Sequence, residues 1–168
     1  KVEEAELLVR RAIEDGDALV RGHPAVPGYR EELAKLLGYA ADLYSASPTE
    51  PFHDPGRALE LAHRAVELSS DNRDMAWQSL GWARYRAGDW KGCIETLNKM
   101  KEVKCSGFVL AMGHWQLGDK AKAREVFTRM DEWLSGYERV WKPDVYPTPA
   151  MLRRFRSEAA ALLGLEPT

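Results

Sequence analysis

The sequence predicts an all-α fold of helix hairpins packed into one domain. The stretch from Asp74 to Ser135 carries the same pattern twice, aligned on Gly88 and Gly118, which are 30 residues apart. Each copy has an apolar helical pattern, a Gly-Asp turn and a second apolar helical pattern, and a period in this range indicates stacked repeats. The chain has 168 residues, 45% hydrophobic and 30% charged, the size and composition of an ordinary globular domain.

The leading segment, residues 1–22, has the spacing of an amphipathic helix, with apolar residues recurring three and four apart. Ala5 and Ala12 are seven residues apart, as small residues are in the second helix of a repeat. We therefore expect residues 1–22 to form the second helix of a repeat whose first helix is missing here. The chain is accordingly expected to be part of a longer protein. Gly22, Pro24 and Pro27 end this helix.

Residues 27–70 form the first predicted repeat, in which a helix from Pro27 is followed by a proline-rich loop, SPTEPFHDP, and a second helix. Asp54 is a predicted N-cap and Pro55 a predicted first helical residue. Repeats two and three span 71–103 and 104–135.

In these two repeats we expect Gly88 and Gly118 to end the first helices, and Asp89 and Asp119 to cap the second ones. After Ser135 the periodic pattern breaks. A last helix, in residues 148–164, is expected to close the array, because a terminal repeat otherwise exposes an apolar face.

Several motifs resemble those of tetratricopeptide-repeat proteins. Trp77, Leu80 and Gly81 fit the W-x-x-L-G of that family, and Ala123 and Phe127 fit its A-x-x-x-F, although Arg84 stands where the family has Tyr. The resemblance implies an α-solenoid, a right-handed superhelix of about three antiparallel hairpins and about eight helices in all. Small residues are expected where the paired helices come closest: Gly38, Gly81, Ala111, Ala58, Cys93 and Ala123.

The resemblance also implies a concave binding groove lined by the first helices of the repeats. Such a groove would be rich in aromatic side chains, which is typical of binding hot spots. Carried over position by position, the predicted groove residues are Tyr39, Gln78, Trp82, Tyr85, Arg86, Phe108, Met112, Trp115 and Gln116. The alternative is that these rings pack on each other, on the N-terminal helix or beneath the loop that holds Trp141.

The charge pattern bears on which partners to expect. Net charge is −2, from 24 basic and 26 acidic residues that alternate along the chain, so no basic stripe favours nucleic acid. The longest uncharged apolar runs are shorter than the roughly 20 residues of a membrane-spanning helix, so no membrane partner is expected. The two cysteines, Cys93 and Cys105, both lie in helical patterns, which fits reduced thiols and a cytoplasmic location.

No catalytic motif is recognisable, and we expect neither enzymatic activity nor a cofactor. The four histidines lack the spacing of a metal site, so no metal is expected. Phrases such as ARYRAGDW and HWQLGDKAKAREVF are similar to divergent repeats appended to bacterial serine/threonine kinases and related signalling proteins. The expected function is therefore that of a scaffold that binds a protein or peptide segment, as an accessory module of a larger signalling protein. The alternative is an intramolecular regulatory element or an oligomerisation element of an enzyme such as a serine/threonine kinase.

Overall fold

The computed structural model describes residues 2–47, 52–70, 73–101, 106–142 and 147–165. Within these ranges the chain forms helices and no strand, which confirms the predicted all-α fold and the expected number of helices. The helices are α1 (Val2–Gly22), α2 (Pro27–Ala46), α3 (Pro55–Leu68), α4 (Arg73–Arg86), α5 (Trp90–Leu97), α6 (Gly107–Gln116), α7 (Lys120–Val140) and α8 (Pro149–Leu163).

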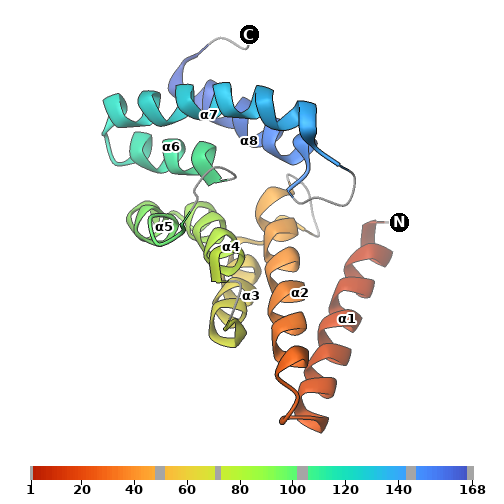
Figure 1. Ribbon diagram of the computed structural model, residues 1–168. Helices are drawn as coiled ribbons and strands as arrows, with labels where there is room; N and C mark the ends of the chain where they lie inside the picture. Colours follow the sequence, from red (N-terminus) through yellow and green to blue (C-terminus); the bar gives the residue numbers. More distant parts are fainter. Residues whose placement is uncertain (1, 48–51, 71–72, 102–105, 143–146, 166–168) are drawn as a thin grey trace.

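The helices pack mainly on their neighbours in the chain (Figure 1). The pairs α2–α3, α4–α5 and α6–α7 correspond to the three predicted hairpins. Helix α4 also contacts α2, and α8 contacts α6 as well as α7. Helix α1 lies at one edge, against α2.

The turns inside the second and third hairpins have the predicted chemistry. Gly88 and Gly118 have φ angles of 80° and 85°, a left-handed conformation that glycine adopts without steric cost. Asp89 accepts a hydrogen bond from the backbone N–H of Gly92 at 2.9 Å, and Asp119 accepts one from that of Lys122 at 3.1 Å. Both aspartates are therefore N-caps, as expected.

Capping also defines the start of α3 and of α8. Asp54 accepts from the backbone N–H of Arg57 at 2.8 Å, and Pro55 is the first helical residue, so this prediction is confirmed. Thr148 caps α8 through the backbone N–H of Met151, at 3.3 Å. The loop before α3 lies partly outside the described residues, as do the ends of repeat two and the start of repeat three.

The small residues lie where helices approach each other, as predicted. A Cβ atom added at Gly81 would be 2.3 Å from Cδ2 of Leu97, much closer than two carbon atoms can pack. One added at Gly38 would be 3.2 Å from Oγ of Ser79. Four further small residues are 0% exposed: Ala58, Cys93, Ala111 and Ala123.

Arg84, which departs from the family pattern, joins the two helices of the second hairpin. Its guanidinium donates to the carbonyl of Gly92 at 3.1 Å and to Oγ1 of Thr96 at 2.7 Å. These hydrogen bonds link α4 to α5, so Arg84 contributes a polar contact between the paired helices.

Helix α7 continues past Ser135, where the periodic pattern breaks, through Gly136 to Val140. The rings of Trp133 and Tyr137, one helical turn apart, stack with their centroids 4.8 Å apart, and this pair supports the extra turn. The tyrosine hydroxyl also donates to the carbonyl of Pro147 at 2.8 Å, which fixes the chain just before α8.

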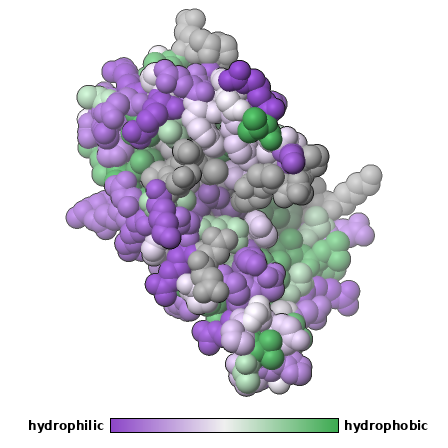
Figure 2. All heavy atoms as spheres, viewed as in Figure 1, coloured by the Kyte–Doolittle hydropathy of each residue, from purple (hydrophilic) through white to green (hydrophobic). Residues whose placement is uncertain are grey.

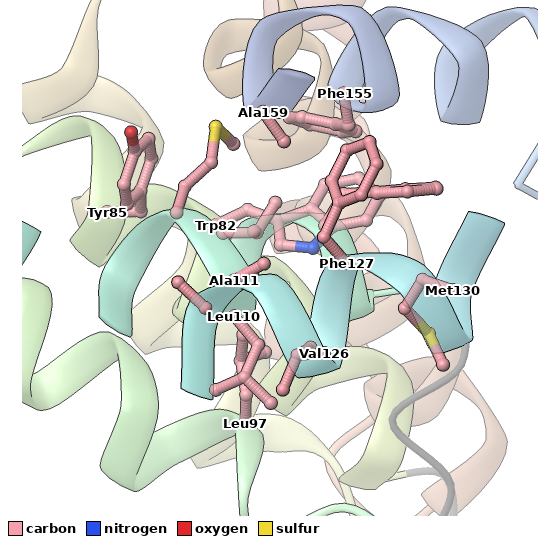
Figure 3. Packing of buried hydrophobic residues seen from close by; sticks show 14 of the residues in the cluster. Trp82, Tyr85, Leu97, Leu110, Ala111, Val126, Phe127, Met130, Phe155 and Ala159 are labelled. Carbon is pink, nitrogen blue, oxygen red and sulfur yellow. The ribbon is translucent and has the colours of Figure 1, made fainter. Parts of the chain in front are cut away.

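The buried side chains form two clusters. The first joins α1, α2, α3 and α4 and includes Ile13, Leu37 and Leu61. The second joins α4 to α8 and includes Trp82 and Phe155, which are labelled in Figure 3. Helix α4 contributes to both clusters and thus connects the two parts of the core.

Candidate functional site

The centre of the predicted groove is not open, because three of its residues lie in the core. Trp82 and Phe108 are each 1% exposed, and Met112 is 0% exposed. The ring of Trp82 packs on Phe155 of α8, with centroids 4.6 Å apart (Figure 3). Helix α8 therefore covers Trp82, and Phe108 packs on Phe127 of α7, with ring centroids 5.6 Å apart. The expected exposure of these three residues is corrected.

The indole of Trp82 is also satisfied in its polar part. Its Nε1–H donates to Oγ of Ser106, at 3.1 Å, and both groups are buried. A buried indole that packs on one ring and donates to one hydroxyl has the environment of a core residue. The alternative in which the aromatic rings pack within the protein thus holds for Trp82.

Tyr85, Gln116 and Gln78 are also withdrawn from solvent to different degrees. Tyr85 is 9% exposed, and burial is the largest cause that raises the pKa of its hydroxyl, while a hydrogen bond with Gln116 lowers it. Gln78 is 5% exposed, and Gln116 is half-buried. Tyr85 of α4 and Gln116 of α6 therefore meet at the contact between these two helices.

Arg86 joins three helices. Its guanidinium donates two hydrogen bonds to the carboxylate of Glu158 in α8, one of them 2.6 Å long, and donates through Nε to the carbonyl of Ser45 in α2 at 2.7 Å. The Arg86 side chain is 18% exposed and that of Glu158 is 34% exposed. This predicted groove residue therefore holds α8 in place, and its charge is already compensated within the chain.

Trp115 is half-buried and lies between cations of the following helix. The ammonium of Lys120 is 5.0 Å from the centre of its ring, and the guanidinium of Arg124 is 5.2 Å from the same ring. Both distances are in the range of cation–π attraction. This indole is thus covered in part by α7, a contact that the repeat pattern alone did not reveal.

Tyr39 is the predicted groove residue that stays well exposed. It is 44% exposed on α2, and Leu43, one turn further on, is 37% exposed. On the same helix Lys35 donates to the carboxylate of Glu32 at 2.7 Å, beside these apolar groups. The surface that remains open is a short strip of α2, defined by Glu32, Lys35, Tyr39 and Leu43, which we call the α2 strip.

A second feature, which sequence reasoning missed, is a cleft of about 290 Å³ between α7 and α8. It is lined by Asp131, Leu134, Ser135, Glu138, Arg153 and Arg156. The guanidinium of Arg153 donates to Glu138 at 2.7 Å, and Arg156 pairs with Asp131. Since each arginine already binds a carboxylate of the facing helix, the cleft has the chemistry of a charged helix–helix seam. Only the late extension of α7 brings Glu138 here.

Burial shifts the pKa values of two titratable side chains, Cys93 and His114, so that the neutral form is favoured. Burial raises the pKa of the Cys93 thiol from 9.0 to about 12, so this cysteine is an inert core group, and Cys105 lies outside the described residues. Burial also lowers the pKa of His114, which is only partly offset by Asp119, 3.7 Å from its Nδ1. Among the residues with described placement, no group of three His, Cys, Asp or Glu side chains is arranged to hold a metal ion.

None of the helices in the described ranges has both the length and the apolar character needed to span a bilayer. The comparisons with known proteins add no identification: no protein-family model matches the chain, and neither the curated proteins nor the solved structures contain a match.

Proposed function

We propose that this chain is a protein-binding scaffold of the tetratricopeptide-like α-solenoid type, which binds a segment of another protein on the α2 strip. The observation that carries the proposal is the exposure of Tyr39, at 44%, in a surface where the other large rings of the predicted groove are covered. Tyrosine is enriched at binding hot spots because it buries a large apolar area at low entropic cost while its hydroxyl hydrogen-bonds.

The distribution of exposed apolar side chains also favours a binding surface at the α1–α2 end of the molecule. Six large hydrophobic residues exposed by more than a third lie between Leu7 and Leu43, on α1, α2 and the turn between them. In Figure 2, hydrophobic spheres gather on the side of the molecule where α1 and α2 lie. Exposed apolar surface of this kind, bordered by charged side chains, is typical of protein-interaction sites.

The chemistry of the α2 strip defines the ligand. One exposed ring and one leucine offer apolar anchoring, and the neighbouring Lys35–Glu32 pair offers one donor and one acceptor group. We infer a short peptide segment with a large apolar anchor residue, bound to a preformed helical surface that loses little entropy on binding. The resemblance to repeats appended to bacterial kinases supports a role as an accessory module in a signalling protein.

The experiment is selection of peptides from a displayed random library on the immobilised protein. We expect enriched peptides with an apolar anchor, and we expect Tyr39→Ala to weaken their binding about tenfold or more, as loss of a hot spot of about 1.4 kcal/mol would. Trp115→Ala, a half-buried ring outside the strip, is the matched control. Enrichment of no sequence, or equal binding by the Tyr39→Ala protein, would contradict the proposal.

The alternative is that the strip contacts the parent chain or a second copy. The concentration of exposed apolar residues on α1 and α2 is the observation that favours it. A mass measured in solution that rises with concentration, and falls back to that of one chain in the Tyr39→Ala variant, would favour this alternative over the peptide-binding role.

A further inference from the structure

Helix α1 carries an apolar face that no described helix covers. Ala5, Leu8, Ala12 and Leu19 lie within about 60° of one another around the helix, at about 100° per residue. Leu8 is 60% exposed and Leu19 is 43% exposed, and both alanines are exposed as well. We call these four residues the α1 face.

The rest of the protein shows what normally lies on such a face. Counting from the small residues, Ala5, Leu8 and Ala12 of α1 occupy the same positions as Ala58, Leu61 and Ala65 of α3. Those three residues of α3 are each 0% exposed, and α2, the first helix of the same hairpin, packs on α3. Helices α5 and α7 are likewise paired with α4 and α6. The α1 face is therefore the position of a first helix, and it is bare.

The α1 face is also held in a fixed place. Ile13 is 4% exposed, and a Cβ added at Gly16 would be 2.9 Å from Cδ1 of Leu33, so α1 packs closely on α2. Two polar contacts add to this packing. Tyr44 donates to Glu6 at 3.0 Å, and Arg64 of α3 donates to Asp17 at 2.6 Å. The bare face is thus the continuation of an interface that already orders α1.

We propose that the α1 face binds an amphipathic α-helix of a partner protein, antiparallel to α1, in the position that α2 takes on α3. Ala5 and Ala12 allow the partner backbone to approach closely, and Leu8 and Leu19 fit between its side chains. This goes beyond the proposed function, because it uses another surface and another kind of ligand than the α2 strip.

Charge defines the partner helix further. At about 100° per residue, the acidic residues Glu4 and Asp15 flank the α1 face, and Glu4 lies in the first turn of the helix. An antiparallel partner brings its C-terminal end close to Glu4. Basic residues are favoured there, both by the dipole of the partner helix and by pairing with Glu4. The partner is therefore a basic amphipathic helix. The same acidic character disfavours a surface of anionic lipid.

A second copy of the chain fits the α1 face less well. In a folded copy the first helices α2, α4 and α6 already cover α3, α5 and α7, so only its own α1 is left to offer. Pairing α1 with α1 would set alanines against alanines and bring two acidic helices together. A partner with larger side chains and positive charge is the better complement.

The test uses a synthetic peptide as the probe, since α2 is a helix known to fit such a face. The peptide has the α2 sequence, residues 27–46, with Glu31→Lys and Glu32→Lys, and its binding to the whole protein is measured by fluorescence anisotropy. We expect saturable binding that weakens at least about tenfold in Leu8→Glu and weakens with rising salt. Leu117→Glu, which changes a leucine that is 51% exposed at the far end of the molecule, is the matched control and should leave binding unchanged.

Two further measurements separate the outcomes. The same peptide with Leu37→Glu should not bind, because Leu37 is 0% exposed and belongs to the core cluster that α2 shares with α3. The Tyr39→Ala protein should bind the probe normally, which distinguishes this site from the α2 strip. Absence of saturable binding, or equal binding by Leu8→Glu, would overturn the proposal. So would a dimer in sedimentation velocity that Leu8→Glu dissolves, because a second copy would then occupy the face.

Discussion

A matched pair of glycine-to-alanine substitutions tests the helix packing most sharply, because the same chemical change has opposite expected effects at two sites. At Gly81 the new Cβ would be 2.3 Å from Cδ2 and 2.6 Å from Cγ of Leu97. Leu97 is 0% exposed and has no room to swing aside. At Gly136, inside α7, nothing lies within 4 Å of the new Cβ.

The magnitudes follow from two competing terms. Alanine stabilises a helix interior by about 1 kcal/mol relative to glycine, and this gain applies to both sites. Overpacking costs about 1 to 3 kcal/mol, and it applies at Gly81 alone. We therefore expect Gly81→Ala to lower the free energy of unfolding by up to about 2 kcal/mol, and Gly136→Ala to raise it by up to about 1 kcal/mol.

Urea denaturation followed by circular dichroism measures both variants. If the free energy of unfolding depends equally on urea concentration in both variants, the two measurements report the same unfolding transition. For a chain of this size, 1 kcal/mol corresponds to a shift of roughly 2 to 4 °C in Tm, which gives an independent check. The close approach of α4 and α5 would be refuted if Gly81→Ala stabilised the protein as much as Gly136→Ala does.

Three other predictions concern charge and titration. First, Glu158→Gln should lower the free energy of unfolding by about 1 to 2 kcal/mol, because it removes a charge-assisted pair with Arg86. Chemical denaturation in low and high salt should show a smaller loss at high salt. An unchanged free energy of unfolding would contradict the role of Arg86 as a link to α8. Second, burial lowers the pKa of His114, so the unfolded chain takes up the proton first and the free energy of unfolding should fall as pH drops below about 6.5. His114→Gln should flatten that part of the stability–pH profile. An unaltered slope would argue against a buried neutral imidazole. Third, burial raises the pKa of Cys93 to about 12, so the free energy of unfolding should decline as pH rises from about 9 toward 12. Site-resolved mass spectrometry should find Cys93 alkylated slowly in the native protein and quickly in urea. Fast alkylation of Cys93 in the native protein would show that the thiol is accessible.

Local sequence signals were sufficient to predict the hairpins. Gly88 and Gly118 end helices because they reach a positive φ without strain, and Asp89 and Asp119 cap the next ones, so these features depend on a few adjacent residues. Gly81 is different, because its small size is required by Leu97, a residue of the other helix of the same hairpin.

The state of the groove was not predictable in this way, because it depends on contacts between residues far apart in the sequence. The apolar pattern of α8 indicated a cap for the last repeat. Nothing local showed that Phe155 would reach Trp82, or that Glu158 would pair with Arg86, 72 residues away. The same pattern of apolar residues fits a side chain that lines an open groove and one that lies beneath a covering helix.

The extension of α7 shows a different limit. The periodic pattern breaks after Ser135 and Gly136 is a weak helix former, so nothing local indicated that α7 would continue to Val140. The stacking of Tyr137 on Trp133 and its bond to Pro147 outweigh the weak propensity of one glycine. Tertiary contacts therefore set this boundary, and they brought Glu138 opposite Arg153.

The central claim is that α8 packs across the first-helix surface of the hairpins and fills the groove that the repeat pattern predicts. A double-mutant cycle with Trp82→Leu and Phe155→Leu measures that contact directly, by chemical denaturation of the wild type, both single variants and the double variant. The account predicts a coupling energy of about 0.5 to 1.5 kcal/mol, the contribution of an aromatic pair in contact. Additive effects of the two substitutions, within about 0.3 kcal/mol, would contradict it and leave Trp82 available in an open groove.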